Sequence, residues 1–333
     1  MKRSVHWTTA LRKRGPENCS VPPTAIVGAA RLNSMSFRHD MIAITQETQR
    51  RARHCHRRWL LAATLLLTAP EMIVALPFTH RAHWDKAFRR GIKAYEECDF
   101  VGAEKQFKTA VIAATRFGLE DPRAVQSLNR LGMAYAAQRK YEDAEKIHER
   151  ALSIAEAWLG PEHPAVAETL DYLGVLYAEQ GNLQEAEPLL RRSLTMREKL
   201  FGPEDLQVAA TLNHLGELCL GQGSYSEAEL SFLKSRAIRK KVLGASHPAV
   251  ASVEHNLGLL YAAERKYAEA EPLYQSALRI YRETLGSNHC ETALLLRDYA
   301  TLLQKTNRDA DAERMQAEAF AIMENQIQRE AKK

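Results

Sequence analysis

The chain has 333 residues, of which 45% are apolar and 26% are charged. This composition excludes a chain that is disordered throughout, because it supplies enough apolar side chains for an ordered core, and the length would suit two ordinary domains. Residues 1–80 hold 12 Lys and Arg against four Asp and Glu. Residues 81–333 therefore hold 34 Lys and Arg against 37 Asp and Glu, although the net charge of the whole chain is +5. The basic excess therefore belongs to the N-terminal segment, and we expect no nucleic-acid partner for the remainder.

Residues 1–58 are a basic leader that we expect to be disordered, and its last nine residues read RRARHCHRR. The apolar run WLLAATLLLTAP follows, so we interpret residues 59–78 as a hydrophobic signal or anchor segment. This run is shorter than the roughly 18 residues of a membrane-spanning helix, and a secretory signal cleaved near Ala75 fits it better. Ile73 is a poor neighbour for that cleavage, and initiation at Met41 would give a signal of more ordinary length.

Other interpretations of the leader stay open. The sequence RRWLL at 57–61 weakly resembles a twin-arginine export signal, and the Arg-rich, acid-poor first 40 residues are also typical of an organelle transit peptide. An uncleaved anchor and a solvated tail fit as well. We expect export or membrane association, in the periplasm if the protein is bacterial, with cytoplasmic and organellar locations as the alternatives.

Three series of small residues recur every 42 residues after the leader. The series are Gly132, Gly174, Gly216 and Gly258, continued by Ala300; Ala144, Ala186, Ala228, Ala270 and Ala312; and Gly118, Gly160, Gly202, Gly244 and Gly286. Because three independent series share one register, they predict a tandem repeat.

Each repeat is predicted to be a pair of helices. In AVAETLDYLGVLYAEQG, residues 165–181, the apolar side chains recur at spacings of four, three and four, as on one face of a helix. Gly181 and Asn182 then break the pattern, and a second helical stretch runs to Gly202, which suits the left-handed residue just past a helix end. If the two helices fold back on each other, the first-series glycine and the alanine 12 residues later meet at their crossing, where a larger side chain would separate the backbones.

The loops between repeats carry helix-start signals. Asp121-Pro122, His163-Pro164 and His247-Pro248 place proline where the first helical turn needs no amide donor, after a residue suited to capping. His163, His247 and His289 share one loop position, but neighbouring repeats would hold them roughly 10 Å apart, too far to share a metal ion. We therefore expect N-terminal caps or loop packing from these histidines, and no metal site.

These residues carry a family resemblance. The order Leu170, Leu173-Gly174, Tyr177, Ala186, Leu190 resembles the tetratricopeptide pattern, and EAEPLL, EAEPLY and LGPEHP resemble the repeats of kinesin light chains. The resemblance covers residues 83–325, or six helix-turn-helix repeats with an atypical first and last unit, and leaves 326–333 as a polar tail. It implies an all-α fold, a right-handed superhelix of the α-solenoid type.

The resemblance also implies a binding face. In that family the first helices line a concave groove, and the positions three and two before each repeat glycine face it. Those positions hold Asn129 and Arg130, Asp171 and Tyr172, Asn213 and His214, His255 and Asn256, and Arg297 and Asp298. In kinesin light chains the place commonly reads Asn-Asn and contacts an extended peptide; only Asn129, Asn213 and Asn256 match, and each residue alone also fits a solvated surface. The repeated Lys/Asn pattern of chaperone-binding relatives is missing, so we do not predict a terminal carboxylate as ligand.

Two further features bear on this interpretation. Glu254 replaces the leucine found at Leu128, Leu170, Leu212 and Leu296, either to meet a basic partner or on a locally loosened helix. Cys98, Cys219 and Cys290 are expected to be buried thiols, because a stack of helices needs no disulfide framework.

The sequence predicts a non-enzymatic scaffold that binds a peptide or protein segment and needs no cofactor. The alternative is a regulatory or assembly subunit tethered to a membrane through residues 59–78. An enzyme comes third: SFLK at 231–234 imitates the nucleophile motif of penicillin-binding enzymes without its companion motifs, and no phosphate loop, HExxH or CxxC motif is present.

Overall fold

A computed structural model describes residues 75–331, in which all regular structure is helical. Residues 1–58, and most of the predicted hydrophobic segment, lie outside the described residues. In chain order the helix pairs are α2 (Ala75–Glu96) with α3 (Phe100–Ala114), α4 (Pro122–Ala137) with α5 (Tyr141–Ile154), α6 (Pro164–Glu179) with α7 (Leu183–Phe201), α8 (Leu206–Gln222) with α9 (Tyr225–Leu243), α10 (Pro248–Ala263) with α11 (Tyr267–Thr284), and α12 (Cys290–Lys305) with α13 (Asp309–Ala331). A 3₁₀ turn, η3 (Thr115–Phe117), extends α3, and a π-helical turn, η4 (Ala155–Leu159), extends α5.

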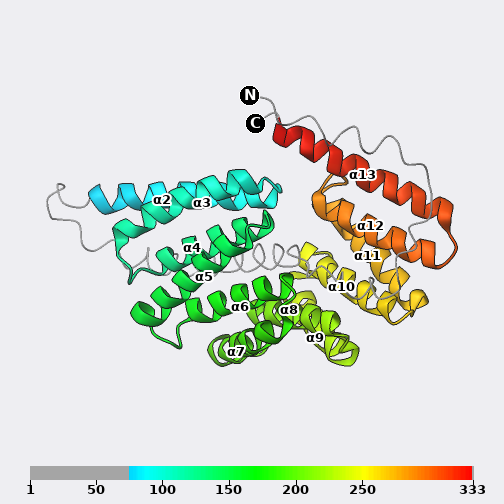
Figure 1. Cartoon of the computed structure of the whole chain (residues 1–333), viewed down its shortest axis with the longest axis horizontal. Helices are drawn as coiled ribbons and strands as arrows, with labels where there is room; N and C mark the ends of the chain where they lie inside the picture. The colour runs from blue at the N-terminus through cyan, green and yellow to red at the C-terminus, as the bar shows by residue number, and fades with distance from the viewer. Residues whose placement is uncertain (1–74, 332–333) are drawn as a thin grey trace, which may run out of the picture.

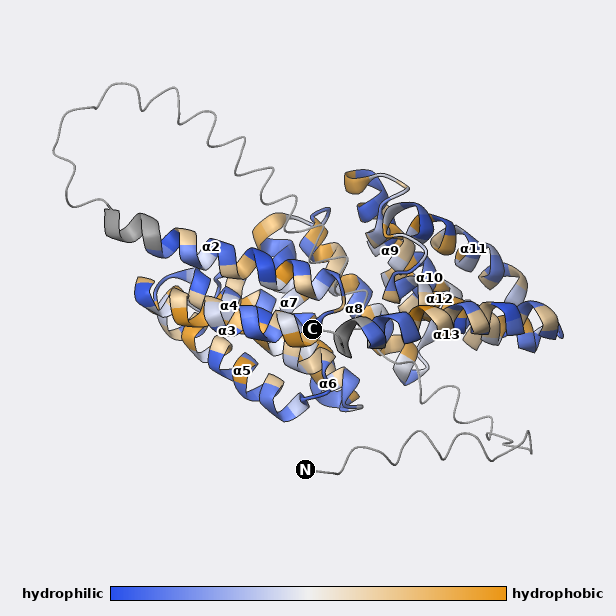
Figure 2. Cartoon of the chain, turned by 90° about the horizontal axis from the view of Figure 1, so that it is seen from above, coloured by the Kyte–Doolittle hydropathy of each residue, from blue (hydrophilic) through white to orange (hydrophobic). Residues whose placement is uncertain are grey.

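The six pairs confirm the predicted all-α, right-handed superhelix. Each helix packs against its partner and against the next pair, so the core is a continuous series of interfaces rather than one central cluster. Figure 1 shows the pairs following a curved path from α2 to α13. Hydrophilic and hydrophobic residues alternate around each helix in Figure 2, as expected of helices that bury one apolar stripe.

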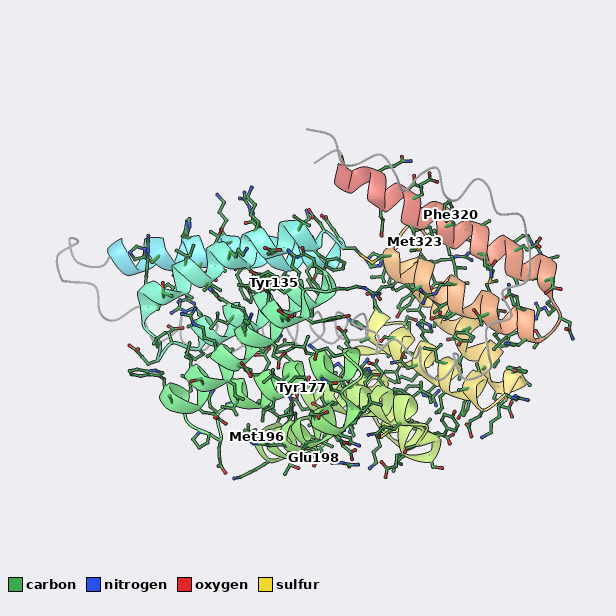
Figure 3. The ribbon with its side chains drawn as sticks, in the orientation of Figure 1. Tyr135, Tyr177, Met196, Glu198, Phe320 and Met323 are labelled. Carbon is green, nitrogen blue, oxygen red and sulfur yellow. A yellow bond between two sulfur atoms is a disulfide. The ribbon has the colours of Figure 1, made fainter. Side chains whose placement is uncertain are left out.

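The ends of the array differ from its middle. The last helix, α13, continues to Ala331 and so includes most of the segment predicted as a tail. Phe320 and Met323 lie on this helix with 69% and 44% of their surfaces exposed, whereas Tyr135 and Tyr177 of the inner repeats are half-buried (Figure 3). Among the helices of residues 75–331, none combines the length and the apolar character needed to cross a membrane.

Side chains at the predicted loop position cap the first helices. Asp121 accepts a hydrogen bond from the amide two residues later at 2.9 Å, and His163 and His247 do so at 3.1 Å through Nδ1. Asp205 and His289 repeat the arrangement although no proline follows them. The prediction that the histidines are N-terminal caps is confirmed, and the reason is that each Nδ1 satisfies one of the free amides of a helix start.

The loop glycines adopt a different conformation from the one predicted. Gly160 and Gly202 have the expected positive φ, 95° and 84°, but their ψ values of 154° and 161° are extended and not left-handed helical. Gly118 and Gly244 behave in the same way. This region of backbone space is accessible essentially only to glycine, which explains the residue even though the space around Gly160, Gly202 and Gly244 is open.

Close packing explains the glycines of the first helices. A Cβ added to Gly174 would lie 2.6 Å from Leu190, and one added to Gly216 would lie 2.5 Å from the ring of Phe232. The same relation, with a large side chain 16 residues after the glycine, joins Gly91 to Phe107, Gly132 to His148, and Gly258 to Tyr274. The predicted alanines, Ala144, Ala186, Ala228 and Ala270, are fully buried one turn earlier on the second helices. The glycine and the alanine are therefore both needed, but the side chain that fills the space over each glycine is that of the large residue 16 positions later.

Replacing Ala186 by Leu is expected to lower the free energy of unfolding by about 1–3 kcal/mol, because the added carbons must enter a fully packed crossing. Thermal unfolding followed by circular dichroism measures this effect. Gln184→Leu, at an exposed position of the same helix, serves as the control and should change stability by less than about 0.5 kcal/mol. Equal melting temperatures for the two variants would contradict the packing assignment.

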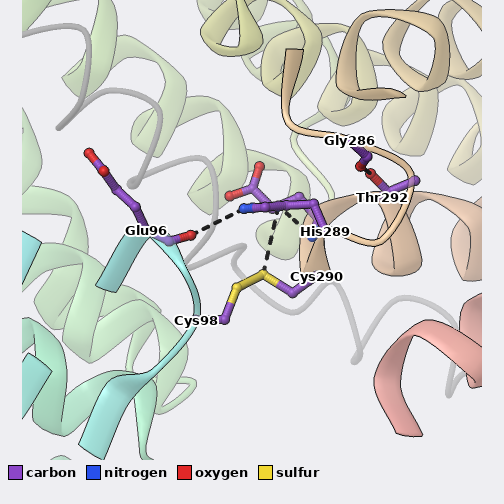
Figure 4. Close-up of a disulfide and its surroundings, with 7 residues drawn as sticks. Glu96, Cys98, Gly286, His289, Cys290 and Thr292 are labelled. Carbon is purple, nitrogen blue, oxygen red and sulfur yellow. Dashed lines mark hydrogen bonds between the residues drawn. A yellow bond between two sulfur atoms is a disulfide. The ribbon is translucent and has the colours of Figure 1, made fainter. Parts of the chain in front are cut away.

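The expectation of free thiols is wrong for two of the three array cysteines. Cys98, in the turn between α2 and α3, forms a disulfide with Cys290, the first residue of α12, and their Cα atoms are 6.8 Å apart (Figure 4). The two residues are 192 positions apart in sequence, so only the curvature of the whole array brings the first repeat to the sixth. Cys219 is free and buried, as expected.

Candidate functional site

The ten residues predicted to face the groove lie on the first helices of five successive repeats, α4, α6, α8, α10 and α12. Arg297 and Asp298 on α12 are half-buried, and the other eight expose at most 5% of their surface. We call these ten residues the inner seam. Their role in binding a partner stays a prediction, but their burial requires that their polar groups have partners.

Members of the inner seam contact one another from repeat to repeat. His214 Nδ1 lies 3.1 Å from Asp171 Oδ2, Asn256 Nδ2 donates to Asn213 Oδ1 at 3.1 Å, and His255 Nε2 lies 3.1 Å from Asp298 Oδ2. Arg130 donates in the same way to the hydroxyl of Tyr172. The two residues of each pair are 42 or 43 positions apart in sequence, which is one repeat length or one residue more. The seam is therefore a polar connection between repeats.

Asp171 is the centre of a buried charge cluster. Its Oδ2 lies 3.2 Å from Arg197 of α7, and Arg197 also donates to the Thr211 hydroxyl at 2.6 Å and the Gln207 carbonyl at 3.0 Å. Burial alone would raise the pKa of Asp171, but the charges of Arg197 and His214 outweigh it and lower the pKa below its usual value. Asp171 is accordingly ionised and binds α6 to both α7 and α8.

The predicted amides form a second cluster around a carboxylate. Asn213 and Asn256 both donate to Glu217 Oε1, at 2.9 Å and 2.7 Å. Asn129 instead donates to the Thr169 hydroxyl at 2.9 Å. Burial, and then the charge of Glu217, raise the pKa of the neighbouring Glu179 to about 8. Glu179 is thus largely protonated at neutral pH and has a hydrogen to donate, although its side chain keeps some contact with solvent.

Some buried polar atoms in and around the inner seam have no hydrogen-bond partner in the described part of the chain. They are Arg130 Nε, Asp171 Oδ1, Arg197 Nε and Glu254 Oε2. The other oxygen of Glu254 lies 2.8 Å from Lys240 Nζ on α9, so this glutamate meets a basic group of its own chain. An unsatisfied buried polar group destabilises a protein by about 1–3 kcal/mol.

A family model for the tetratricopeptide repeat matches the chain at 123–199, 173–241, 207–283 and 249–325, which together cover more than half of it. The chain belongs to the tetratricopeptide repeat family. The resemblance to this family is confirmed, and the ends of the four matched segments are 42 residues apart, as in the three series of small residues.

Two similar solved structures, with TM-scores of 0.53 and 0.55, share this tetratricopeptide fold. BtubC (BKLC) from P. vanneervenii has a TM-score of 0.53 at 19% identity, over 74% of this chain and 91% of its own. A Rap protein complexed with Competence and Sporulation Factor has a TM-score of 0.55 at 16% identity, over 74% and 76%. The nearly identical repeats of a putative kinesin light chain from Podosopora anserina are 24% identical over 61% and 97%, with a TM-score of 0.49. No curated protein matches the chain.

The described part of the tetratricopeptide array has a small pocket beside the seam. Its volume open to the centre of a water molecule is about 20 Å³, which is room for about one water and not for a cofactor. Its lining includes Tyr95, Met133, His148, Tyr172, Val175 and Glu179. The pocket therefore lies among side chains of α2, α4, α5 and α6.

Sequence reasoning missed the partners on the second helices, chiefly Arg197 and Lys240. One signal was available: Arg197 and Arg239 are 42 residues apart, at a position that holds Ala155 and Tyr281 in the flanking repeats. Buried arginine at a repeated position indicates an internal carboxylate or carbonyl partner. Arg239 indeed donates to the Ala249 carbonyl at 2.7 Å.

His148 should make the protein sensitive to acid. It occupies the place of Leu190 and Phe232, over Gly132, and burial lowers its pKa to about 3. In the unfolded chain the imidazole takes up a proton near pH 6.5, whereas in the folded protein it stays neutral down to its lowered pKa. The free energy of unfolding is therefore not reduced by His148 above pH 6.5. It falls by up to about 1.4 kcal/mol per pH unit between pH 6.5 and the folded pKa.

The variant His148→Phe removes this titration while keeping a large group over the glycine. Urea unfolding at pH 6.5 and pH 5 should show the wild type losing about 2 kcal/mol more than the variant. Groups that titrate in both proteins cancel in the comparison. Identical pH dependence in the two proteins would show that the imidazole is not held neutral.

Proposed function

We propose that this tetratricopeptide repeat protein is a non-enzymatic scaffold whose concave face binds an extended peptide or protein segment. The observation that carries the proposal is the row of polar side chains on successive first helices, which includes two buried atoms without a hydrogen-bond partner in the described residues, Arg130 Nε on α4 and Asp171 Oδ1 on α6. One atom is a donor and the other an acceptor. A peptide backbone offers both a carbonyl and an amide at every residue, whatever its side chains.

Two neighbours in fold support this choice of ligand. One Rap protein was solved with Competence and Sporulation Factor and another Rap regulator with the Phr* peptide. Both are less than 20% identical to this chain, so they share the fold and offer a precedent only.

Binding can be tested with peptides selected from a random display library against the full-length protein. Fluorescence anisotropy then gives Kd for the wild type, for Arg130→Lys and for Arg150→Lys. Lysine at 130 keeps the charge but removes the Nε donor together with the nitrogen that donates to the Tyr172 hydroxyl, and we expect Kd to weaken about tenfold, the effect of one hydrogen bond to a charged group. Arg150 is exposed on a second helix, and its variant should bind like the wild type. Equal binding by all three proteins would place the peptide elsewhere.

We also propose that the protein is exported or held at a membrane. The disulfide between Cys98 and Cys290 supports this location, because structural disulfides persist mainly in oxidising compartments. Fractionation and N-terminal sequencing of the native protein test it. A chain that starts near Leu76 and is free of membrane agrees with a secreted scaffold, and a full leader retained in the membrane fraction agrees with the tethered regulatory or assembly subunit. An intact leader in a cytoplasmic fraction would reject both, and residues upstream of Met41 would reject initiation there.

A further inference from the structure

The link between the first and sixth repeats contains more than two sulfurs. The ligand atoms of Cys98, His289 and Cys290 all lie within 4.8 Å of one another, and both cysteines are buried (Figure 4). We propose that, when the disulfide is reduced, these three residues bind one zinc ion. This site is separate from the inner seam and does not depend on the peptide-binding proposal.

The distances suit a tetrahedral metal. With Zn–S of about 2.3 Å and Zn–N of about 2.0 Å, sulfur and nitrogen ligands of one ion are separated by about 3.6 Å. Cys290 Sγ and His289 Nδ1 are 3.9 Å apart. The two Cα atoms, 6.8 Å apart, are at the wide end of the range for disulfides, so the sulfurs have room to separate toward an ion between them.

The imidazole is already oriented for metal binding. His289 Nε2 lies 3.1 Å from the Glu96 carbonyl oxygen, and because a carbonyl only accepts, Nε2 carries the hydrogen. Nδ1 therefore has the lone pair, on the side of the Cys290 sulfur. In the disulfide form this lone pair accepts a hydrogen bond from the Glu291 amide at 3.3 Å, which a zinc ion would replace. Histidine ligands usually donate their second N–H to a carbonyl or carboxylate in this way, which fixes the tautomer. Here that carbonyl belongs to the first repeat and the ring to the sixth.

The cysteines are local departures from the repeat pattern. Cys290 is the first residue of α12, where the other inner repeats have Pro122, Pro164, Leu206 and Pro248. A helix N-terminus favours the thiolate, which is the form that binds metal. Cys98 has φ 64°, at a turn position where the other repeats have Arg139, Gly181, Gly223, Arg265 and Asn307. Both departures fall on the two loops that the curvature brings together.

Reduction of the disulfide and binding of zinc are two separate steps. An external dithiol such as dithiothreitol supplies two electrons and two protons, the Cys98–Cys290 bond breaks into two thiols, and the dithiol becomes its own disulfide. Zinc then displaces both thiol protons into solvent and takes one nitrogen from His289. Three protein ligands leave the fourth position for water. Two thiolates and an imidazole select zinc over calcium or magnesium, which prefer oxygen ligands.

The test uses the full-length protein, reduced with dithiothreitol and freed of it without oxygen. Cobalt(II) reports thiolate ligands through its charge-transfer absorption, and competition with a chromophoric chelator gives zinc stoichiometry and Kd. His289→Asn keeps a capping oxygen at the helix start but removes the ligand, and His247→Asn is the matched control in a loop without cysteine. Cys98→Ser/Cys290→Ser removes both sulfurs, while the remaining cysteines supply the same background in every variant.

We expect one zinc ion in the reduced wild type and in His247→Asn, binding at least tenfold weaker in His289→Asn, and loss of this site in the double serine variant. The oxidised wild type should show no cobalt–thiolate band. Reduced wild type without bound zinc would overturn the proposal, as would equal affinity in His289→Asn and His247→Asn or retention of the site without the two sulfurs. The His289→Asn comparison is made on a protein that keeps both cysteines, so it remains decisive if the double variant is unstable.

Discussion

Changing both Cys98 and Cys290 to serine is expected to lower the free energy of unfolding by about 3–5 kcal/mol. The disulfide closes a loop spanning 192 positions, and the chain-entropy account gives about 5 kcal/mol for a loop of this size, of which measured proteins often show less. The loss of stability should be concentrated in the first and sixth repeats, because each repeat of a solenoid otherwise contacts only its neighbours.

Urea unfolding of the oxidised protein, with a chelator present to exclude metal, measures this loss. Cys219→Ser is the control, since Cys219 is free, and dithiothreitol should reproduce the loss in the wild type but leave the double variant unchanged. The same unfolding midpoint for oxidised wild type and double variant would show that the two end repeats are held together by other contacts.

Asp171→Ala is expected to have the second large effect and to lower the free energy of unfolding by about 3–5 kcal/mol. It removes the carboxylate that faces Arg197 and His214 and leaves a buried guanidinium without its counter-charge. The pKa of Asp171 is lowered, so its contribution is present above the unfolded pKa of about 3.9 and is lost only as the pH falls through the lower folded value. At pH 7 the full effect should be visible in urea unfolding.

Glu162→Ala is the matched control for this second prediction. Glu162 pairs with Lys199 at 2.7 Å, but both side chains are mostly exposed, and such pairs contribute at most about 1 kcal/mol. A loss of similar size in both variants would mean that burial does not strengthen the Asp171 cluster.

The fold followed from the sequence because its signals are local and repeated. Gly174 and Leu190, the caps at Asp121 and His163, and the turn at Gly181 each act within one helix pair, so spacing alone locates them. The inner seam was predicted to the correct helices, but its internal pairing was not. Asp171 and His214 meet only because adjacent first helices are aligned one residue out of register with the repeat, a property of the packing.

The remaining features depend on the global path of the chain. No pattern within a repeat indicates that Cys98 meets Cys290, because their approach is the sum of the rotations of all the repeats between them. Arg197 and Lys240 were overlooked for a related reason, since their carboxylate partners belong to other helices.

The link between the first and sixth repeats has a consequence for how this array can change in evolution. From the first repeat to the fifth, each helix pair is closed by the same contact, in which a glycine of the first helix lies against Phe, His, Leu or Tyr of the second, so single units are nearly interchangeable. Inserting or deleting one unit would nevertheless carry Cys98 away from Cys290 by the rise and rotation of a whole repeat. Duplication, the usual way in which solenoids lengthen, would break the covalent bond here, and we therefore expect a chain with this cysteine pair to keep its present number of repeats.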